Sequence, residues 1–406
     1  MTYIEKGTKE YRKASLSLFL GGFVTFAILY TTQPLMPIFA KEFHVSASRA
    51  SISLSVSTGV LAIVMLIVAG LSDAIGKKRI MSLSLFFTSI LGLLTSLSPN
   101  FMTLLIFRSL LGIFIAGVPA IAMAYVAEEF NPKGIGQIMG LYISGTSFGG
   151  MAGRIITGVL TDLFSWRIAL MTIGGISLIL SLVFWLTLPA SRHFVKKTLD
   201  WETAWAAYKA HLSNKRIIAL IMLSFLLMGS FVTLYNYIGF LLHDPPYRLS
   251  ETMIGFIFIV YLCGTFSSIY MGKKADKYGR SIILKISITI MVGGAILTLV
   301  PSLIGIIIGI SIFTFGFFAS HSIACAWVGD CAVNNKAQAS SLYLLFYYLG
   351  SSLVGSFVGH FWTQFHWIGV ISLISVLLVC GYPLVLFAQK GEQISTQYNI
   401  KIKKGL

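Results

Sequence analysis

The stretch GLSDAIGKKR, residues 70–79, decides the fold, because it returns in related form as GKKADKYGR at residues 272–280. In both stretches an aspartate is followed three residues later by a glycine and then by a cation. The two aspartates, Asp73 and Asp276, are 203 residues apart, and each stretch lies between two long apolar runs. A charged turn that recurs after half of a 406-residue apolar chain indicates an internally duplicated protein.

The composition is that of a membrane protein. Hydrophobic residues make up 56% of the chain and charged residues 11%, against about 25% charged residues in soluble domains. Because a spanning helix needs about 20 apolar residues, the hydropathy pattern predicts an all-α protein with twelve transmembrane helices. We expect them near residues 15–38, 47–70, 80–98, 102–124, 137–160, 167–188, 217–241, 252–272, 282–300, 303–326, 339–361 and 367–389.

The net charge of +16 reports orientation and not a nucleic-acid partner. If both termini are cytoplasmic, the cytoplasmic segments hold 23 of the 30 Lys and Arg residues, while the outer loops hold Lys41, Arg49, Arg167 and Arg248. This asymmetry is the positive-inside rule. We therefore expect a multi-pass protein of the cytoplasmic (inner) membrane with both termini inside.

The duplication covers most of the chain. AMAYVAE at 122–128 aligns with ACAWVGD at 324–330, and Trp166 aligns with Trp367, at offsets of 202 and 201 residues. Six spans separate the copies, so both halves have the same orientation. The predicted organisation is a six-helix half at 1–188, a cytoplasmic linker at 189–214, a second half at 215–390 and a cytoplasmic tail at 391–406.

The linker has a helical apolar stripe surrounded by cations. Its members are Trp201, Trp205, Tyr208 and Leu212. The pattern predicts an amphipathic helix on the inner membrane surface. Its role is either to space the two halves or to act in regulation or lipid sensing.

These motifs resemble the major facilitator superfamily over roughly residues 12 to 390. The loop signature of that family, Gly-x-Leu-x-Asp-x-x-Gly-Arg/Lys-Lys/Arg, is matched by Leu71, Asp73, Gly76, Lys77 and Lys78. The second copy keeps Gly272, Asp276, Gly279 and Arg280, and Arg108 with Gly112 matches the family's Arg-x-x-x-Gly element. Gly145, Gly149 and Gly153 match part of its antiporter motif.

Finer features, such as GLYISG at 140–145 and SWRIAL at 165–170, resemble the bacterial acriflavine-sensitivity exporter group of this superfamily. The resemblance implies two parallel six-helix halves and export of small molecules by alternating access. It also implies a proton gradient as the energy source, since no nucleotide-binding motif is visible and no cofactor is expected.

The charged turns are expected to gate transport. In this fold an aspartate at the inner end of a span meets the positive N-terminal dipole of a facing helix, so we expect Asp73 and Asp276 to latch the state that is closed on the inside. Gly76 and Gly279 suit the turn because glycine tolerates a positive φ. A surrounding cytoplasmic charge network is predicted from Lys77, Lys78, Arg79, Glu128, Arg280 and Asp330.

Two arginines lie inside predicted spans of the first half. Arg108 and Arg154 each carry a charge whose mid-membrane position costs at least about 2.5–3.5 kcal/mol. They therefore either form structural hydrogen bonds, to backbone or to Tyr and Gln of the first span, or provide a fixed positive charge that affects substrate choice or a proton site. Arginine stays protonated, so neither carries a transported proton; the candidates for that are Asp73, Glu128, Asp330 and His321.

Polar and aromatic residues on four spans predict the substrate cavity. They are Tyr30, Gln33, Tyr235, Asn236, His321, Tyr343 and Tyr347. An apolar wall with a few polar groups suits an amphipathic small molecule. Glycines spaced four apart, namely Gly145, Gly149 and Gly153 with Gly355 and Gly359, predict close helix packing. We expect them where the halves move; packing within one half is the alternative.

The sequence therefore predicts a monomeric secondary transporter, a proton-coupled antiporter that exports small amphipathic or cationic compounds. It is not expected to be an enzyme or to bind metal or nucleic acid, and its partners are a small-molecule substrate and the lipid bilayer. Two alternatives remain: export of a sugar or other metabolite, and a membrane sensor or lipid scramblase on the same scaffold.

Overall fold

The computed structural model describes residues 3–131, 135–194, 201–332 and 334–389. Contacts divide the chain into two compact units. The first is Met1–Leu199 with Tyr235–Ile259, and the second is Asp200–Leu234 with Val260–Leu406. The predicted tail at 391–406 and residues 195–200 of the predicted linker lie outside the described residues.

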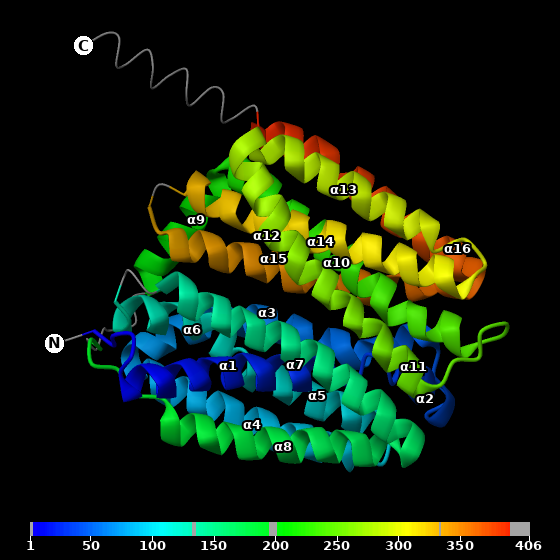
Figure 1. Cartoon of the computed structure of the whole chain (residues 1–406), viewed down its shortest axis with the longest axis horizontal. Helices are drawn as coiled ribbons and strands as arrows, with labels where there is room; N and C mark the ends of the chain where they lie inside the picture. The colour runs from blue at the N-terminus through cyan, green and yellow to red at the C-terminus, as the bar shows by residue number, and fades with distance from the viewer. Residues whose placement is uncertain (1–2, 132–134, 195–200, 333, 390–406) are drawn as a thin grey trace, which may run out of the picture. The chain divides into compact units, whose positions relative to one another are not determined.

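The first half of the sequence is helical almost throughout its described part. Its helices are α1 (Lys9–Tyr30), α2 (Met36–Glu42), α3 (Ala47–Ile75), α4 (Lys77–Ser96), α5 (Phe101–Ile115), α6 (Gly117–Glu129), α7 (Ile135–Leu163) and α8 (Trp166–Thr187). In the packed pairs of this unit, α1 lies along α7, α4 along α8 and α3 along α5 (Figure 1).

The second half repeats this plan after a linker helix. Its elements are α9 (Trp201–Ser213), α10 (Lys215–His243), α11 (Glu251–Phe256), the short 3₁₀ helix η2 (Ile257–Val260), α12 (Tyr261–Tyr278), α13 (Arg280–Leu297), α14 (Leu303–Cys331), α15 (Lys336–Phe357) and α16 (Gly359–Val379). The unit boundaries differ from the predicted halves because α11 packs along α7, which joins residues 235–259 to the first unit.

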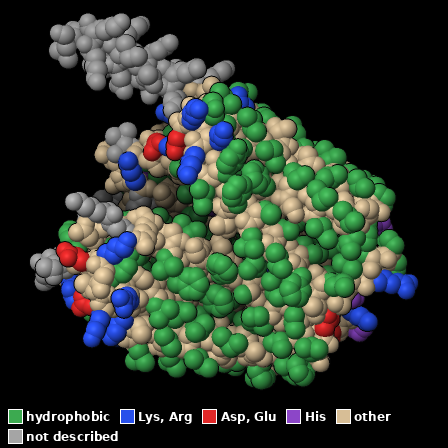
Figure 2. All heavy atoms as spheres, in the orientation of Figure 1, with side chains coloured by type: hydrophobic (Ala, Val, Ile, Leu, Met, Phe, Trp, Pro, Cys, Tyr) green, Lys and Arg blue, Asp and Glu red, His purple; other side chains and the backbone are tan. Residues whose placement is uncertain are grey.

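Each of the twelve predicted apolar runs lies on these helices, so the predicted fold class is confirmed. Within the described residues, ten helices are long and apolar enough to cross a membrane, and α7 and α15 account for the other two runs. In the lower part of Figure 2, over the helices of the first unit, apolar side chains cover the flank and charged side chains gather towards the helix ends. Such a flank suits contact with lipid.

Local sequence explains where these helices begin and end. Serine or asparagine side chains accept a backbone N–H at the start of α3, α5, α8, α11 and α14, which satisfies donors that a helix leaves free. Gly76, between α3 and α4, has φ +109°, and Gly279, between α12 and α13, has φ +91°. Both turns therefore need glycine, as the sequence predicted.

The predicted linker helix is present as α9, which packs on α15. His211 makes the polar contact, its Nε2 lying 3.0 Å from the carbonyl oxygen of Asn335. Of the predicted apolar stripe, Trp205 and Leu212 are exposed on the protein surface, and the Trp201 side chain lies outside the described residues. Those two exposed side chains stay available to a membrane surface.

Candidate functional site

The first charged turn is closed by a lysine that binds two acids. Nζ of Lys77 lies 2.8 Å from Oδ1 of Asp73 and 2.9 Å from Oε1 of Glu128. The Lys77 side chain is 4% exposed, whereas the two acids are about two-fifths exposed. Because the lysine is buried, its charge depends on both partners, so the contact joins the α3–α4 turn to the end of α6.

The second charged turn uses the corresponding cation differently. Arg280 stands 203 residues after Lys77 and forms an ion pair with Asp330, the repeat partner of Glu128. Asp276, the repeat partner of Asp73, is exposed and forms no ion pair with a described residue. The two halves thus share the turn and the helix-end acid but not the contact to the motif aspartate.

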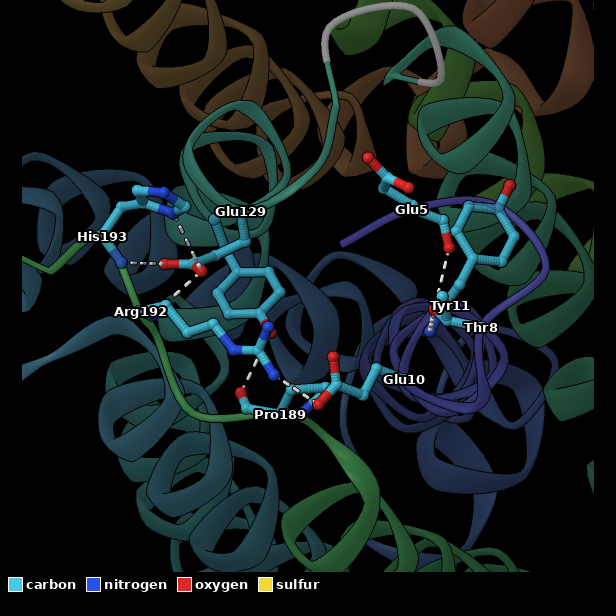
Figure 3. Close-up of polar contacts among 9 residues, drawn as sticks. Glu5, Thr8, Glu10, Tyr11, Glu129, Pro189, Arg192 and His193 are labelled. Carbon is cyan, nitrogen blue, oxygen red and sulfur yellow. Dashed lines mark hydrogen bonds and ion pairs between the residues drawn. The ribbon is translucent and has the colours of Figure 1, made fainter. Parts of the chain in front are cut away.

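Glu129, next to Glu128, anchors a third polar cluster (Figure 3). Its carboxylate is 1% exposed and accepts backbone N–H groups of Arg192 at 2.9 Å and His193 at 3.1 Å. Arg192 in turn forms an ion pair with Glu10 of α1, and Tyr125 donates to the carbonyl of Pro189 at 3.0 Å. The cluster fastens the chain after α8 to α6 and to the N-terminal segment.

Arg108, one of the two intramembrane arginines, bonds to backbone. Nε donates to the carbonyl of Ser53 at 2.9 Å, Nη1 to Ile28 at 3.1 Å and Nη2 to Leu29 at 2.5 Å. The carbonyls of Ile28 and Leu29 lie in the last turn of α1, which ends at Tyr30, so the helix itself gives them no N–H partner. The Ile28 carbonyl also accepts the hydroxyl of Thr31 at 3.0 Å. Arg108 therefore donates hydrogen bonds to backbone carbonyls at the end of α1, which is the first of the two roles predicted for it.

Arg154 lies in a different environment, between two aromatic rings. The carbon of its guanidinium group is 4.2 Å from the centre of the Tyr30 ring and 4.5 Å from that of Phe258. Its Nη1 donates to the carbonyl of Gly150 at 2.6 Å, and its Nε donates to Oε1 of Gln33 at 2.8 Å. Aromatic faces stabilise a cation by about 0.5–2 kcal/mol each, so α1, α7 and η2 hold this charge in place.

A chain of amide groups extends from Arg154. A guanidinium group only donates hydrogen bonds, so Gln33 presents its oxygen to it and its amide nitrogen to Asn236. That nitrogen donates to Oδ1 of Asn236 at 2.7 Å. The side-chain nitrogen of Asn236, Nδ2, is buried and has no hydrogen-bond partner among the described residues. The chain of amide groups thus ends in the unsatisfied donor of Asn236, close to the fixed positive charge of Arg154.

The predicted cavity residues form two groups, one in each unit. Tyr30, Gln33 and Asn236 lie in the Arg154 network, and Tyr235 stacks on Phe258 with ring centres 5.1 Å apart. In the second unit, Nδ1 of His321 lies 2.9 Å from the hydroxyl of Tyr343, and its ring is 4.6 Å from that of Tyr347.

Sequence reasoning missed Phe258. It is one of 30 phenylalanines, and nothing in its neighbours marks it as the partner of an arginine.

The glycine stripe of α7 packs within the first unit. A Cβ atom added at Gly145, Gly149 or Gly153 would lie 2.2, 2.1 or 2.7 Å from a backbone oxygen of α1. The expectation that these glycines lie where the halves move is wrong, because α1 approaches them so closely that no side chain fits. In α15 a Cβ atom added at Gly350 would lie 2.2 Å from the backbone oxygen of Phe225, which is a close contact of the same kind. The close packing predicted for Gly355 and Gly359 stays a prediction.

A close glycine contact between the two halves of the sequence lies between α7 and α11. A Cβ atom at Gly158 would lie 2.3 Å from the carbonyl oxygen of Glu251, and one at Gly255 would lie 3.0 Å from that of Arg154. Neither glycine was singled out from the sequence. The contact lies directly beside the Arg154 network.

An acidic pair lies at the same contact. Asp162 of α7 accepts the N–H groups of Glu251 at 3.1 Å and Thr252 at 2.8 Å, which binds it to the start of α11. The Glu251 side chain is 6% exposed, and Nδ1 of His243 lies 3.4 Å from its Oε1. Its two carboxylate oxygens make no hydrogen bond to the described residues. The sequence signal that was overlooked is an acid immediately after the capping serine of a span.

Comparison with known proteins identifies the family. The model of the Major Facilitator Superfamily matches residues 18–355. The chain belongs to this superfamily. It is 48% identical to the MFS-type transporter YybF of Bacillus subtilis (strain 168), with 99% of each chain covered. It is 44% identical to the inner membrane transport protein YnfM of Escherichia coli (strain K12), with 93% of this chain and 90% of the relative covered.

Solved structures show the same fold. A bacterial homologue of the human lysosomal transporter Spinster, in an inward-facing and unoccupied conformation, superimposes with a TM-score of 0.76 over 95% of this chain and 98% of that chain, at 18% identity. A variant of the nucleoside transporter NupG gives 0.74 over 92% and 99%, at 16% identity. The chain is therefore a multi-pass membrane transporter of the major facilitator fold, and its relatives are transporters, not enzymes.

Proposed function

We propose that this transporter is a proton-driven antiporter of the cell membrane that exports small amphipathic compounds by alternating access. The observation that carries the proposal is the Arg154 network, in which a fixed cation, two aromatic rings and the free amide donor of Asn236 meet. Aromatic faces suit an apolar body, and the donors suit a polar end group. As the sequence implied, we expect the protein to act as a monomer without a cofactor.

The sign of the buried charge narrows the substrate class. The sequence has no Asp or Glu between Glu10 and Glu42, between Asp73 and Glu128, or between Glu129 and Asp162, so Arg108 and Arg154 set the charge inside the first half. A cation approaching them is repelled, whereas a carboxylate or another acceptor gains charge-assisted hydrogen bonds. Of the two expected substrate types, amphipathic compounds with an acceptor or anionic end are therefore preferred to cationic ones.

The proton is proposed to bind at Glu251. Burying a charged carboxylate is costly unless it is paired. Beside Glu251 lie the His243 ring, whose Nδ1 is 3.4 Å from Oε1, and a second carboxylate, that of Asp162, which accepts the backbone N–H of Glu251 and repels its charge. One added proton relieves both the burial and the repulsion. Since Glu251 begins α11 at its contact with α7, proton binding would act on the packing of those two helices. Of the four candidates from the sequence, Asp73 and Glu128 are already bound to Lys77 and Asp330 to Arg280. The fourth, His321, is hydrogen-bonded to Tyr343.

Transport into proteoliposomes under an imposed pH gradient tests the proposal. The probes are a fluorescent amphipathic carboxylate and an amphipathic quaternary ammonium dye of matched size. We expect gradient-driven accumulation of the carboxylate, its loss in Arg154→Gln and partial retention in Arg154→Lys. Preferential accumulation of the ammonium dye would overturn the substrate class, and lipid movement without gradient-driven transport would favour a scramblase.

A further inference from the structure

A cavity of about 390 Å³ lies at the beginning of α4, away from the Arg154 network. Its wall is formed by residues 76–79 and Ser82 of the α3–α4 turn and first helical turns, by Trp185 near the end of α8, and by Ser191 and Phe194 after α8. Glu129 fixes that last segment through the N–H groups of Arg192 and His193. The cavity is therefore formed by the start of α4, the end of α8 and the segment after α8 that Glu129 holds, all within the first unit.

Several hydrogen-bond donors line this cavity. The residue before α4 is Gly76, which has no side chain to cap the helix, and no other side chain does so. The N-terminal end of a 20-residue helix, with its first N–H groups and positive dipole end, thus forms part of the cavity wall. This arrangement favours anions.

Two buried hydroxyl groups on the wall are also unsatisfied. The hydroxyls of Ser82, which is fully buried, and Ser191 have no hydrogen-bond partner among the described residues. A buried hydroxyl left without a partner costs about 1–3 kcal/mol, and both hydroxyls could donate to an acceptor bound in the cavity that they line.

The charge of the cavity is positive. Lys77 is neutralised by Asp73 and Glu128. Lys78, which is partly buried, and Arg79, which is exposed, form no ion pair with the residues that the structure describes. Two cations, a helix N-terminus and two unsatisfied hydroxyls therefore converge on one cavity, and the ligand they fit is a phosphate group.

We propose that this cavity binds the phosphate of an anionic phospholipid headgroup. The lipid source is favoured because Trp185 is 37% exposed and the neighbouring Leu186 is 82% exposed, so an apolar surface for acyl chains adjoins the donors. Tryptophan at a helix end is typical of the membrane–water interface, and basic pockets between cytoplasmic helix ends bind anionic headgroups. The site does not depend on the proposed transport reaction.

The second half of the protein provides an internal comparison. At the repeat offset of 203 residues, Lys78 and Arg79 correspond to Ser281 and Ile282. Ser281 donates its hydroxyl to Oε1 of Gln389 at 2.7 Å, and the first residue of α13, Arg280, is paired with Asp330. The same turn in α13 is thus satisfied by the protein itself. Lys285 stands where the first half has Ser82, which makes it a cation at the equivalent depth but outside the cavity.

Native mass spectrometry of the purified full-length protein in detergent tests the proposal, with phosphatidylglycerol and phosphatidylcholine of identical acyl chains as probes. We expect one tightly bound phosphatidylglycerol. Lys78→Gln removes a charge-assisted hydrogen bond and should weaken it about tenfold, and Ser82→Ala should weaken it about threefold. Lys285→Gln makes the same charge change outside the cavity and should leave the affinity unchanged.

Each outcome decides the proposal. Equal binding of both lipids, or equal loss in Lys78→Gln and Lys285→Gln, overturns it. Ser191→Ala and Ser82→Ala remove only a hydroxyl, so they carry the test if Lys78→Gln fails to fold. Addition of inorganic phosphate separates the sources: displacement of the lipid at millimolar phosphate supports a phosphate site that free phosphate fills, and persistence of the lipid adduct supports the headgroup.

Discussion

The packing of α7 on α11 can be tested by a single methyl group at Gly158. The Cβ atom of Gly158→Ala would lie 2.3 Å from the Glu251 oxygen and 3.3 Å from the Cα of Gly255. Both neighbours are backbone atoms, so relief requires the helices to separate by roughly 1 Å, and overpacking of this kind costs about 1–3 kcal/mol. If α7 and α11 separate when the transporter changes state, only the state in which they are packed is destabilised. The equilibrium between the packed and the separated state then shifts towards the separated state by about 5–150-fold.

Cysteine accessibility measures this shift. The reporter is Ile254→Cys on α11, a position that is 1% exposed, in a chain whose native cysteines Cys263, Cys325, Cys331 and Cys380 are replaced by serine. We expect Gly158→Ala to raise the rate of alkylation by a membrane-impermeant maleimide about 5–150-fold.

The matched control is Gly140→Ala, since a methyl group there, on the same helix, meets no atom within 4 Å. Equal alkylation rates for Gly158→Ala, Gly140→Ala and the parent, with all three proteins folded, would refute the role of this contact.

Three further substitutions test the other clusters. Arg108→Ala removes the partner of the buried Leu29 carbonyl and should destabilise the protein by about 1–3 kcal/mol, read as a lower melting temperature in detergent; melting equal to the parent contradicts the role in α1. Glu251→Gln should abolish accumulation driven by a pH gradient but retain substrate exchange. The control, Glu42→Gln, removes an acid that is paired with Arg167 and should keep both activities. Gradient-driven transport in Glu251→Gln would refute the proton site. Asp73→Asn frees one contact of Lys77 and should change the spin-label distance distribution between inner helix ends, and an unchanged distribution and transport rate rule out the latch.

Features set by local sequence could be predicted. The positive φ of Gly76 and Gly279 follows from a tight turn between two apolar runs, and the helices follow from run length and polarity. The two intramembrane arginines were also visible, because a charge in an apolar run stands out whatever its partners are. Bonding to Gln of the first span was one of the two roles predicted for them, and Arg154 does bond to Gln33.

Features set by packing between distant segments could not be predicted. The glycine stripe of α7 has the same spacing whether it meets α1 or a helix of the other half, so sequence alone left its partner open. Gly149 meets α1 because Phe23 presents backbone and not side chain at that level. Phe258 and Glu251 likewise owe their importance to α11 lying along α7, a contact that no local pattern encodes.

The duplicated turns share a shape but cannot share a role. In the first half, Lys77 holds both the motif aspartate and Glu128, so its turn is bonded to α6 and movement of Asp73 must break an ion pair with a buried lysine. In the second half, Arg280 binds Asp330 alone, and Asp276 is exposed. Loss of a partner from a buried charge costs far more than loss of an exposed one. The energetic barrier to rearrangement is therefore concentrated at the first turn, which is also the turn that carries the phosphate cavity, so a lipid bound at Lys78 would act on the more strongly held of the two.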